Sequence, residues 1–160
     1  ITAIPNNLYG ENDNYDLEDS HVIPAIMHKM HLARQTGSSV TLWGDGTPLR
    51  EFTYSKDLAE ILVFLLEHYD LPQPINVGNT GEHSIKEVAE LIAAYVDYDE
   101  QINWDISKPA GQLRKPSSNK RLLELGWRQS MYTDFKVALL AACDWFTANY
   151  PNIRGGNADG

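Results

Sequence analysis

The sequence predicts an α/β fold, in which helices and strands alternate along one chain. Several segments repeat apolar residues at helical spacing, and short runs rich in β-branched and aromatic residues lie between them. With 160 residues, of which 42% are hydrophobic, the chain has enough apolar surface for one core but not for two ordinary domains. We therefore assign residues 1–150 to a single domain and expect the small and polar residues of 151–160 to form a flexible tail.

The first half of the chain is expected to hold three strands and two helices. Residues 1–4 form a β-branched strand ending at Pro5, and a long loop rich in Asn, Asp and Gly follows. Ser20 and Ser55 can cap the two helices, and Gly37 provides the exit from the first. The two strands that flank the DGTP turn should pair as a hairpin. The expected elements are strands at 1–4, 39–44 and 49–55 and helices at 20–36 and 56–70.

The second half reads as short strands between amphipathic helices. Ser84 and Glu87 have the spacing of a capping box, in which each residue satisfies a free amide at the helix start. Ser118 can begin a short helix that ends near Gly126. The expected elements are strands at 74–78 and 102–104 and helices at 85–96, 118–126 and 133–150.

The composition excludes several classes of protein. Thirteen basic and twenty-two acidic residues give a net charge of −9, so we expect no nucleic-acid partner. The single cysteine, Cys143, rules out an internal disulfide and fits a cytoplasmic protein. Because no leader-like segment and no 18-residue apolar run is present, we expect neither export nor a membrane partner. The chain opens on an apolar run without Met, which suggests part of a longer protein.

Two familiar motifs are present only in part. Gly44-Asp45-Gly46 resembles the start of a dinucleotide-binding G-x-G-x-x-G, but position 49 is Leu and a strand follows instead of a helix. Tyr132 and Lys136 have the Y-x-x-x-K spacing of short-chain dehydrogenases, but no glycine fingerprint precedes them. We interpret the first as a turn and the second as the start of the last helix.

Three of the five histidines lie between positions 21 and 31. His21 and His28 are about 10 Å apart along a helix, too far to share a metal ion, and the only cysteine is distant. We expect no metal site, and we place His28 and His31 on a partly solvated helix face. His21 differs because the positive end of the helix dipole favours a neutral imidazole that can accept a proton.

Four segments together resemble the C-terminal part of the GDP-L-fucose synthases, in the extended short-chain dehydrogenase class. They are PNNLYGENDNYDLEDSHVIPAIMHK, VTLWGDGTPLREFTYSKDLA, INVGNTGEHSIKEVAELIA and WDISKPAGQLRK, in that order. The resemblance implies an α+β substrate-binding portion with residual strands of a Rossmann sheet. The N-terminal Rossmann core, with its glycine fingerprint, its Ser and Y-x-x-x-K groups and a catalytic cysteine, would lie outside this chain.

The family converts GDP-4-keto-6-deoxy-D-mannose to GDP-L-fucose. C3 and C5 epimerise, and NADPH then reduces the C4 ketone. The resemblance therefore implies NADP(H) as cofactor of the full-length enzyme, which we expect to be a homodimer, and a GDP sugar as partner. We expect the isolated fragment to be inactive and to hold no cofactor tightly.

Catalytic and cofactor-binding roles follow from matching the motifs. His21, in the S-H-V-I-P motif, corresponds to the acid/base that reprotonates the enolate. Pro5, Asn6, Asn7 and Leu8 correspond to the segment that passes the nicotinamide end of the cofactor, together with His21.

Five further positions correspond to substrate-binding residues. Arg50 can form a bidentate bond to a diphosphate, Lys29 adds a point charge, and Trp43 offers an aromatic surface. Arg114 and Lys115 form a second basic pair in a loop. Simpler interpretations are a surface ion pair for Arg50, a solvated Lys29 and a core Trp43.

Ala110 departs from the family, which commonly has Asp at this position of the S-K-P-x-G loop. A carboxylate contact to the substrate would be lost there, which leaves room for a different sugar. Two alternatives therefore stay open. One is another NAD(P)-dependent sugar-nucleotide epimerase or dehydratase, and the other is a stand-alone sugar-nucleotide-binding module.

Overall fold

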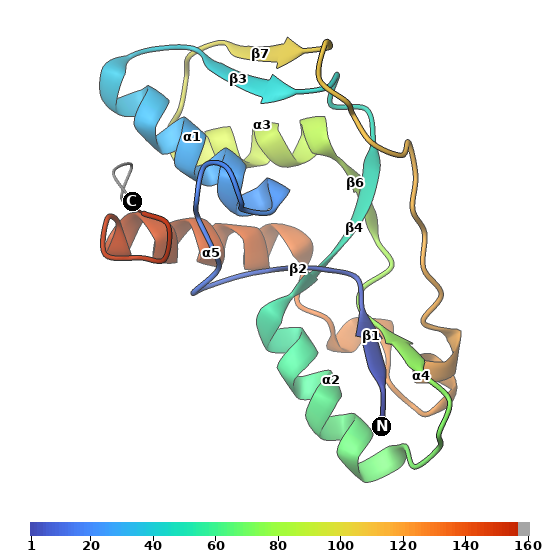
Figure 1. Ribbon diagram of the computed structural model, residues 1–160. Helices are drawn as coiled ribbons and strands as arrows, with labels where there is room; N and C mark the ends of the chain where they lie inside the picture. Colours follow the sequence, from blue (N-terminus) through green and yellow to red (C-terminus); the bar gives the residue numbers. More distant parts are fainter. Residues whose placement is uncertain (157–160) are drawn as a thin grey trace.

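Two separate hydrophobic cores organise the computed structural model, which describes residues 1–156 (Figure 1). The helices are α1 (Val22–Thr36), α2 (Ser55–His68), α3 (Ile85–Tyr95), α4 (Lys120–Glu124) and α5 (Phe135–Asn149). The strands are β1 (Ala3–Pro5), β2 (Asn7–Tyr9), β3 (Val40–Trp43), β4 (Leu49–Tyr54), β5 (Ile75–Val77), β6 (Glu82–Ser84) and β7 (Ile102–Asp105). The order confirms the predicted α/β class, with β2 and β6 as additional short strands.

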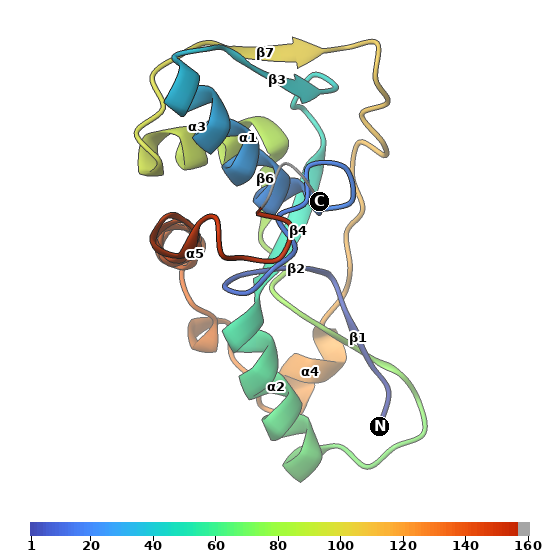
Figure 2. The same ribbon diagram turned by 60° about the vertical axis from the view of Figure 1, so that its left-hand side comes forward.

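The larger core lies among α1, α3, α5 and strands β3 and β4, and the smaller core lies among α2, α4 and β5. Figure 2 shows α1 and α3 side by side under β3 and β7, with α5 below them. The long strand β4 runs from the larger part of the molecule toward α2. Residues on β4 can therefore influence both parts.

The predicted hairpin is wrong. β3 pairs in parallel with β7, while β4 pairs in parallel with β2 and antiparallel with β6. In the turn between β3 and β4, Gly46 has a left-handed φ of 76°, and a Cβ added there would come within 2.7 Å of the Trp104 ring. The Gly46 carbonyl accepts a hydrogen bond from the Lys86 amide at 2.9 Å. The turn is thus bound to α3, and β4 continues into a different sheet.

The helix ends match the predictions in part. Gly37 ends α1 with a φ of 61°, and Ser84 accepts the Glu87 amide at 3.0 Å, as expected. The cap predicted at Ser20 is wrong, because His21 is the N-cap residue and the buried Ser20 hydroxyl has no hydrogen-bond partner in residues 1–156. Ser55 is likewise the first residue of α2 and not its cap.

The apolar stripe of α2 is only partly covered. Ile61 and Leu65 are buried in the smaller core, whereas Leu62, Val63 and Leu66 are 42%, 60% and 76% exposed. This face of the helix therefore has no packing partner within residues 1–156.

Part of the expected flexible tail lies within the described residues. The amide of Tyr15 donates to the carbonyl of Arg154 at 2.9 Å, and Ile153 packs against the larger core. Residues 157–160 lie outside the described part of the chain. Within residues 1–156, no helix has both the length and the apolar character needed to cross a bilayer.

Replacing Asp57 by Ala should destabilise the fold. The buried Asp57 carboxylate accepts hydrogen bonds from the amide of Thr133 at 3.0 Å and from its hydroxyl at 2.6 Å, which joins α2 to the segment before α5. Its removal leaves donors without partners, and we expect the free energy of unfolding to fall by about 1–3 kcal/mol in urea titrations. The exposed Asp70→Ala should change it by less than about 0.5 kcal/mol. Equal effects of the two variants would contradict this role for Asp57.

Candidate functional site

Two cavities meet at the start of α1 and share Val22. The first has a volume of about 250 Å³ and lies between α1 and β3; the second, of about 240 Å³, lies beside β2. The first is lined by Leu17, Glu18, Ser20, Val22, Ala25, Ile26, Lys29, Leu42, Trp43 and Ile85. The second is lined by Asn6, Asn7, Leu8, His21, Val22, Ile23 and Phe52. They adjoin at Val22 in the first turn of α1, and we call the two cavities together the groove.

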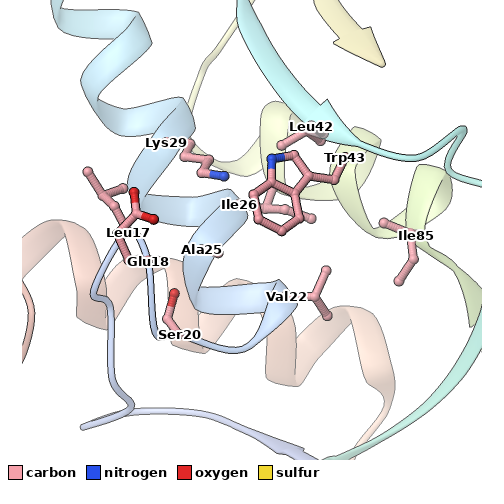
Figure 3. A pocket seen from close by; sticks show the side chains of 10 residues that line it. All are labelled: Leu17, Glu18, Ser20, Val22, Ala25, Ile26, Lys29, Leu42, Trp43 and Ile85. Atoms are coloured by element: carbon pink, nitrogen blue, oxygen red, sulfur yellow. The ribbon is translucent and has the colours of Figure 1, made fainter. Parts of the chain in front are cut away.

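The first cavity holds two of the predicted substrate-binding residues. Figure 3 shows the Lys29 side chain of α1 pointing toward the indole of Trp43, and its Nζ lies 5.6 Å from the ring centroid. Trp43 is 59% exposed, so it is not the core residue of the simpler interpretation. Val22 and Ile85 add apolar surface beside the indole. This end of the groove offers a cation, an aromatic face and an apolar wall.

The second cavity brings His21 together with Asn6, Asn7 and Leu8. His21 is exposed at the N-terminus of α1, and its side chain makes no capping hydrogen bond. The carbonyl of His21 accepts the Ala25 amide at 3.0 Å, which fixes its backbone to the helix. The imidazole is therefore anchored at its Cα and open to a ligand. Pro5 ends β1 opposite Val77 and precedes this lining segment.

The side chain of Asn6 is held within the protein. Its Oδ1 accepts the hydroxyl of Thr53 at 2.5 Å, and its Nδ2 donates to the carbonyl of Asn79 at 2.8 Å and to Glu51 at 3.2 Å. Asn7 donates its Nδ2 to the backbone carbonyl of Glu51 at 2.8 Å. These contacts hold the shape of the segment next to His21.

Glu51 was not predicted as a site residue, and it organises this region. Its carboxylate is only 2% exposed and accepts the amide of Ser117 at 2.9 Å and the hydroxyl of Ser117 at 2.5 Å, in addition to the Asn6 amide. One buried charge thus joins β4 to the Asn6 segment and to residues 106–118, which we call the strap. An acidic residue inside the strand LREFTY, where burial is expected, was the available signal.

Arg50, Arg114 and Lys115 lie at the strap and not in the lining of the two cavities. The Nη1 of Arg50 donates to the carbonyls of Leu49 and Gln112, both at 2.7 Å. Arg114 is ion-paired with Glu82, with its Nε at 2.7 and 2.8 Å from the two carboxylate oxygens, and this bond lowers the pKa of Glu82. Lys115 is exposed. Arg50 and Arg114 are therefore both engaged in contacts within the protein, Arg50 with backbone carbonyls and Arg114 with Glu82.

We expected His28 to lie on a partly solvated helix face, but the structure buries it fully. Its Nδ1 lies 2.7 Å from the carbonyl oxygen of Tyr15, which can only accept, so Nδ1 carries the proton. The expectation failed because the loop before α1 folds over the helix and Tyr150 packs beside it. His31 packs on Tyr150 at 4.4 Å, and burial lowers its pKa. His28 therefore holds the loop that leads to His21.

The remaining motifs have structural roles. The buried hydroxyl of Tyr132 donates to the carbonyl of Gly78 at 2.7 Å, whereas Lys136 is exposed, so their spacing does not form a catalytic pair. Within residues 1–156, no group of three or more His, Cys, Asp or Glu side chains is placed to hold a metal ion.

Comparison with known proteins finds one family model and a set of similar enzymes. The NAD dependent epimerase/dehydratase family matches residues 1–78. The GDP-L-fucose synthase of Sinorhizobium fredii is 42% identical over 93% of this chain, and GDP-L-fucose synthase 1 of Arabidopsis thaliana is 40% identical over 95%; each match covers 47% of the relative. The crystal structure of a GDP-L-fucose synthetase from Naegleria fowleri bound to NADP has a TM-score of 0.90 and 37% identity, covering 95% of this chain and 48% of that one. The chain thus spans about half the length of the relatives it matches.

Replacing Glu51 by Gln should loosen the strap. A carboxamide keeps the size of the side chain but turns an NH₂ group toward donors that need an acceptor, and we expect a loss of about 1–3 kcal/mol in the free energy of unfolding. Hydrogen exchange should show faster exchange of the Ser117 amide in particular.

The matched control is Glu60→Gln, an exposed position on α2. Unchanged protection of the Ser117 amide in the Glu51 variant would show that the carboxylate does not hold the strap.

Proposed function

This chain belongs to the NAD dependent epimerase/dehydratase family, and from that premise we propose that it is the substrate-binding and acid/base-contributing portion of a GDP-L-fucose synthase. The reaction is the NADPH-dependent conversion of GDP-4-keto-6-deoxy-D-mannose to GDP-L-fucose. The observation that carries the proposal is the pair of adjoining cavities, with His21 in one and Lys29 and Trp43 in the other. A sugar nucleotide has the matching asymmetry, with a reactive sugar at one end and a base at the other.

His21 would act on the sugar as a proton donor and acceptor. Hydrogens next to the C4 ketone are acidic enough for side-chain bases, because the resulting enolate is stabilised. Inversion at C3 or C5 requires one group on each face of the ring. His21 supplies one of them, and the second, a cysteine in the family, would come from outside this chain.

The nucleotide would lie along the first cavity. The base or ribose packs on Trp43, and Lys29 neutralises part of the diphosphate charge. Arg50, Arg114 and Lys115 would approach the diphosphate from the strap. Because Arg114 is paired with Glu82, we assign Arg50 the larger share of this contact.

For NADP(H), the residues present fit one end of the cofactor. Leu8, Ile23 and Phe52 give the second cavity apolar walls, which suits a flat ring. The Asn6 and Asn7 amides are bonded to the protein and hold the shape of this wall. Pro5 to Leu8 and His21 would hold this nicotinamide end. The bound cofactor supplies hydride for reduction of the C4 ketone. The dinucleotide's diphosphate requires a glycine-rich turn before a helix, which neither Gly44–Gly46 nor Gly78–Gly81 provides.

The remaining half of the relatives' length would cover the exposed apolar face of α2. Leu62, Val63 and Leu66 lie there, and β1 pairs with β5 along one edge. We place a Rossmann portion against this face and edge, in a cytoplasmic enzyme that acts as a homodimer.

A related conversion of another GDP sugar is the second candidate. A GDP-L-colitose synthase of Yersinia pseudotuberculosis is 40% identical over 91% of this chain. Ala110 of the strap lies close to Gly44, and a Cβ added at Gly44 would come within 3.0 Å of the Ala110 Cβ. The Ala110 side chain brings no carboxylate to the substrate. Comparing turnover of 4-keto sugars that differ at C3 would separate the two activities.

The 160-residue chain alone should not oxidise NADPH in the presence of the keto sugar. Residues 1–156 would provide only the nicotinamide end of a cofactor site, so hydride transfer would lack a bound donor. The measurement is the absorbance of NADPH, with a full-length relative as positive control. Turnover by the chain alone would overturn this division of the enzyme.

In a full-length protein carrying this chain, His21→Gln should lower solvent-deuterium incorporation at C3 or C5 by about 10²–10⁴-fold, the usual contribution of a general acid or base. His68→Gln is the matched control, because His68 is exposed on α2 and distant in sequence from the groove. His28 is unsuitable as a control since it is buried. Equal loss in the two variants would remove His21 from the reaction.

A further inference from the structure

Lys108, at the start of the strap, shares an aromatic partner with Lys29. The Nζ atoms of both lysines lie 5.6 Å from the centroid of the Trp43 indole. The ion pairs among residues 1–156 involve other cations. Two like charges therefore converge on one exposed ring, and within residues 1–156 neither lysine has a carboxylate within ion-pair distance.

The pairing of β3 with β7 places Lys108 there. In this parallel pair Trp43 lies opposite Asp105, so both strands end at the same edge. The Asp105 carbonyl accepts the Gly44 amide at 2.9 Å and the Lys108 amide at 3.2 Å, and the Asp105 carboxylate accepts the Ser107 amide at 3.0 Å. Lys108 thus extends from a hydrogen-bonded turn and not from an unstructured loop. The carboxyl ends of parallel strands are also where α/β proteins usually bind ligands.

The chemistry of this edge selects one class of ligand. Two ammonium groups near one ring repel each other, and an anion placed between them turns that repulsion into two attractions. The indole offers a face for a flat ring, and Val22 and Ile85 offer apolar contact. The net charge of −9 opposes a long polyanion. A small ligand with a planar base and one compact anionic group, a nucleoside diphosphate, satisfies all these conditions.

We propose that Lys108 is a further substrate-binding residue, which together with Lys29 and Trp43 forms a subsite for the nucleoside diphosphate part of the sugar nucleotide. This inference rests on the proposed function and adds to it a residue of the strap. The two lysines contact the diphosphate from two elements, Lys29 from α1 and Lys108 from the turn after β7, which lines a neighbouring cavity with Gly44.

The test is an NMR titration of the 160-residue chain with GDP and, separately, with guanosine, following the indole N–H signal of Trp43. Trp43→Phe identifies that signal among the four tryptophans. Lys108→Gln should raise the Kd for GDP by about fivefold to tenfold, the loss of one charge-assisted contact, and leave guanosine binding unchanged. Lys120→Gln, an exposed lysine of α4, is the matched control and should bind GDP as the wild type does.

The outcomes separate this inference from the proposed function. Wild-type GDP affinity in the Lys108 variant, with weaker binding in Lys29→Gln, would overturn the role of Lys108 alone. Equal weakening of GDP and guanosine would also overturn it, because Lys108 would then not act on the diphosphate. If GDP at millimolar concentration leaves the Trp43 signal of the wild type unmoved, both the subsite and the nucleotide-binding part of the proposed function are wrong.

Discussion

The buried carboxylate of Glu51 is the contact on which the arrangement of the site depends. A charge removed from water is tolerated only when donors surround it, so β4 can be buried only if the Asn6 amide and both donors of Ser117 are in place. These donors come from positions 45 residues before and 66 residues after Glu51. Because burying the Glu51 carboxylate without donors is unfavourable, the Asn6 and Ser117 segments must both meet at β4. The Glu51 carboxylate thus places both the Ser117 end of the strap and the Asn6 segment beside His21.

A second set of contacts sets the position of His21. Tyr15 donates its amide to Arg154, and its carbonyl accepts from the buried His28, so the middle of the loop before α1 is held at both backbone groups. The loop then reaches the helix at His21, which carries no capping bond of its own. A side chain that transfers protons must be free at its tip and fixed at its base, and this loop provides both conditions.

Local charge, and not net charge, would allow this acidic chain to bind the anion that we propose. Lys29 and Lys108 come from different elements and gather at one indole, while Arg50 lies along the same strap. Arg114 is already neutralised by Glu82. Because solvent ions screen the distant acidic groups more strongly than a contact pair, the few cations near the Trp43 ring would dominate the interaction with an anion.

The sequence by itself determined the elements whose pattern is local. Apolar periodicity defined α2, α3 and α5, and the Gly37 exit marked the end of α1. The Ser84 cap and the Gly37 exit depended on neighbouring residues only, and the motif containing His21 could be read directly from the sequence. The groove residues Lys29 and Trp43 were likewise named from their motifs, and the structure placed them together. Only the tertiary structure decided that β3 pairs with β7, that His28 and Glu51 are buried and that Lys108 lies beside the Trp43 ring. Each of these depends on a segment more than ten residues away, and strands of three residues such as β2 and β6 are too short to show a period. Local patterns report the conformation of a segment, whereas burial and pairing depend on what the rest of the chain brings against it.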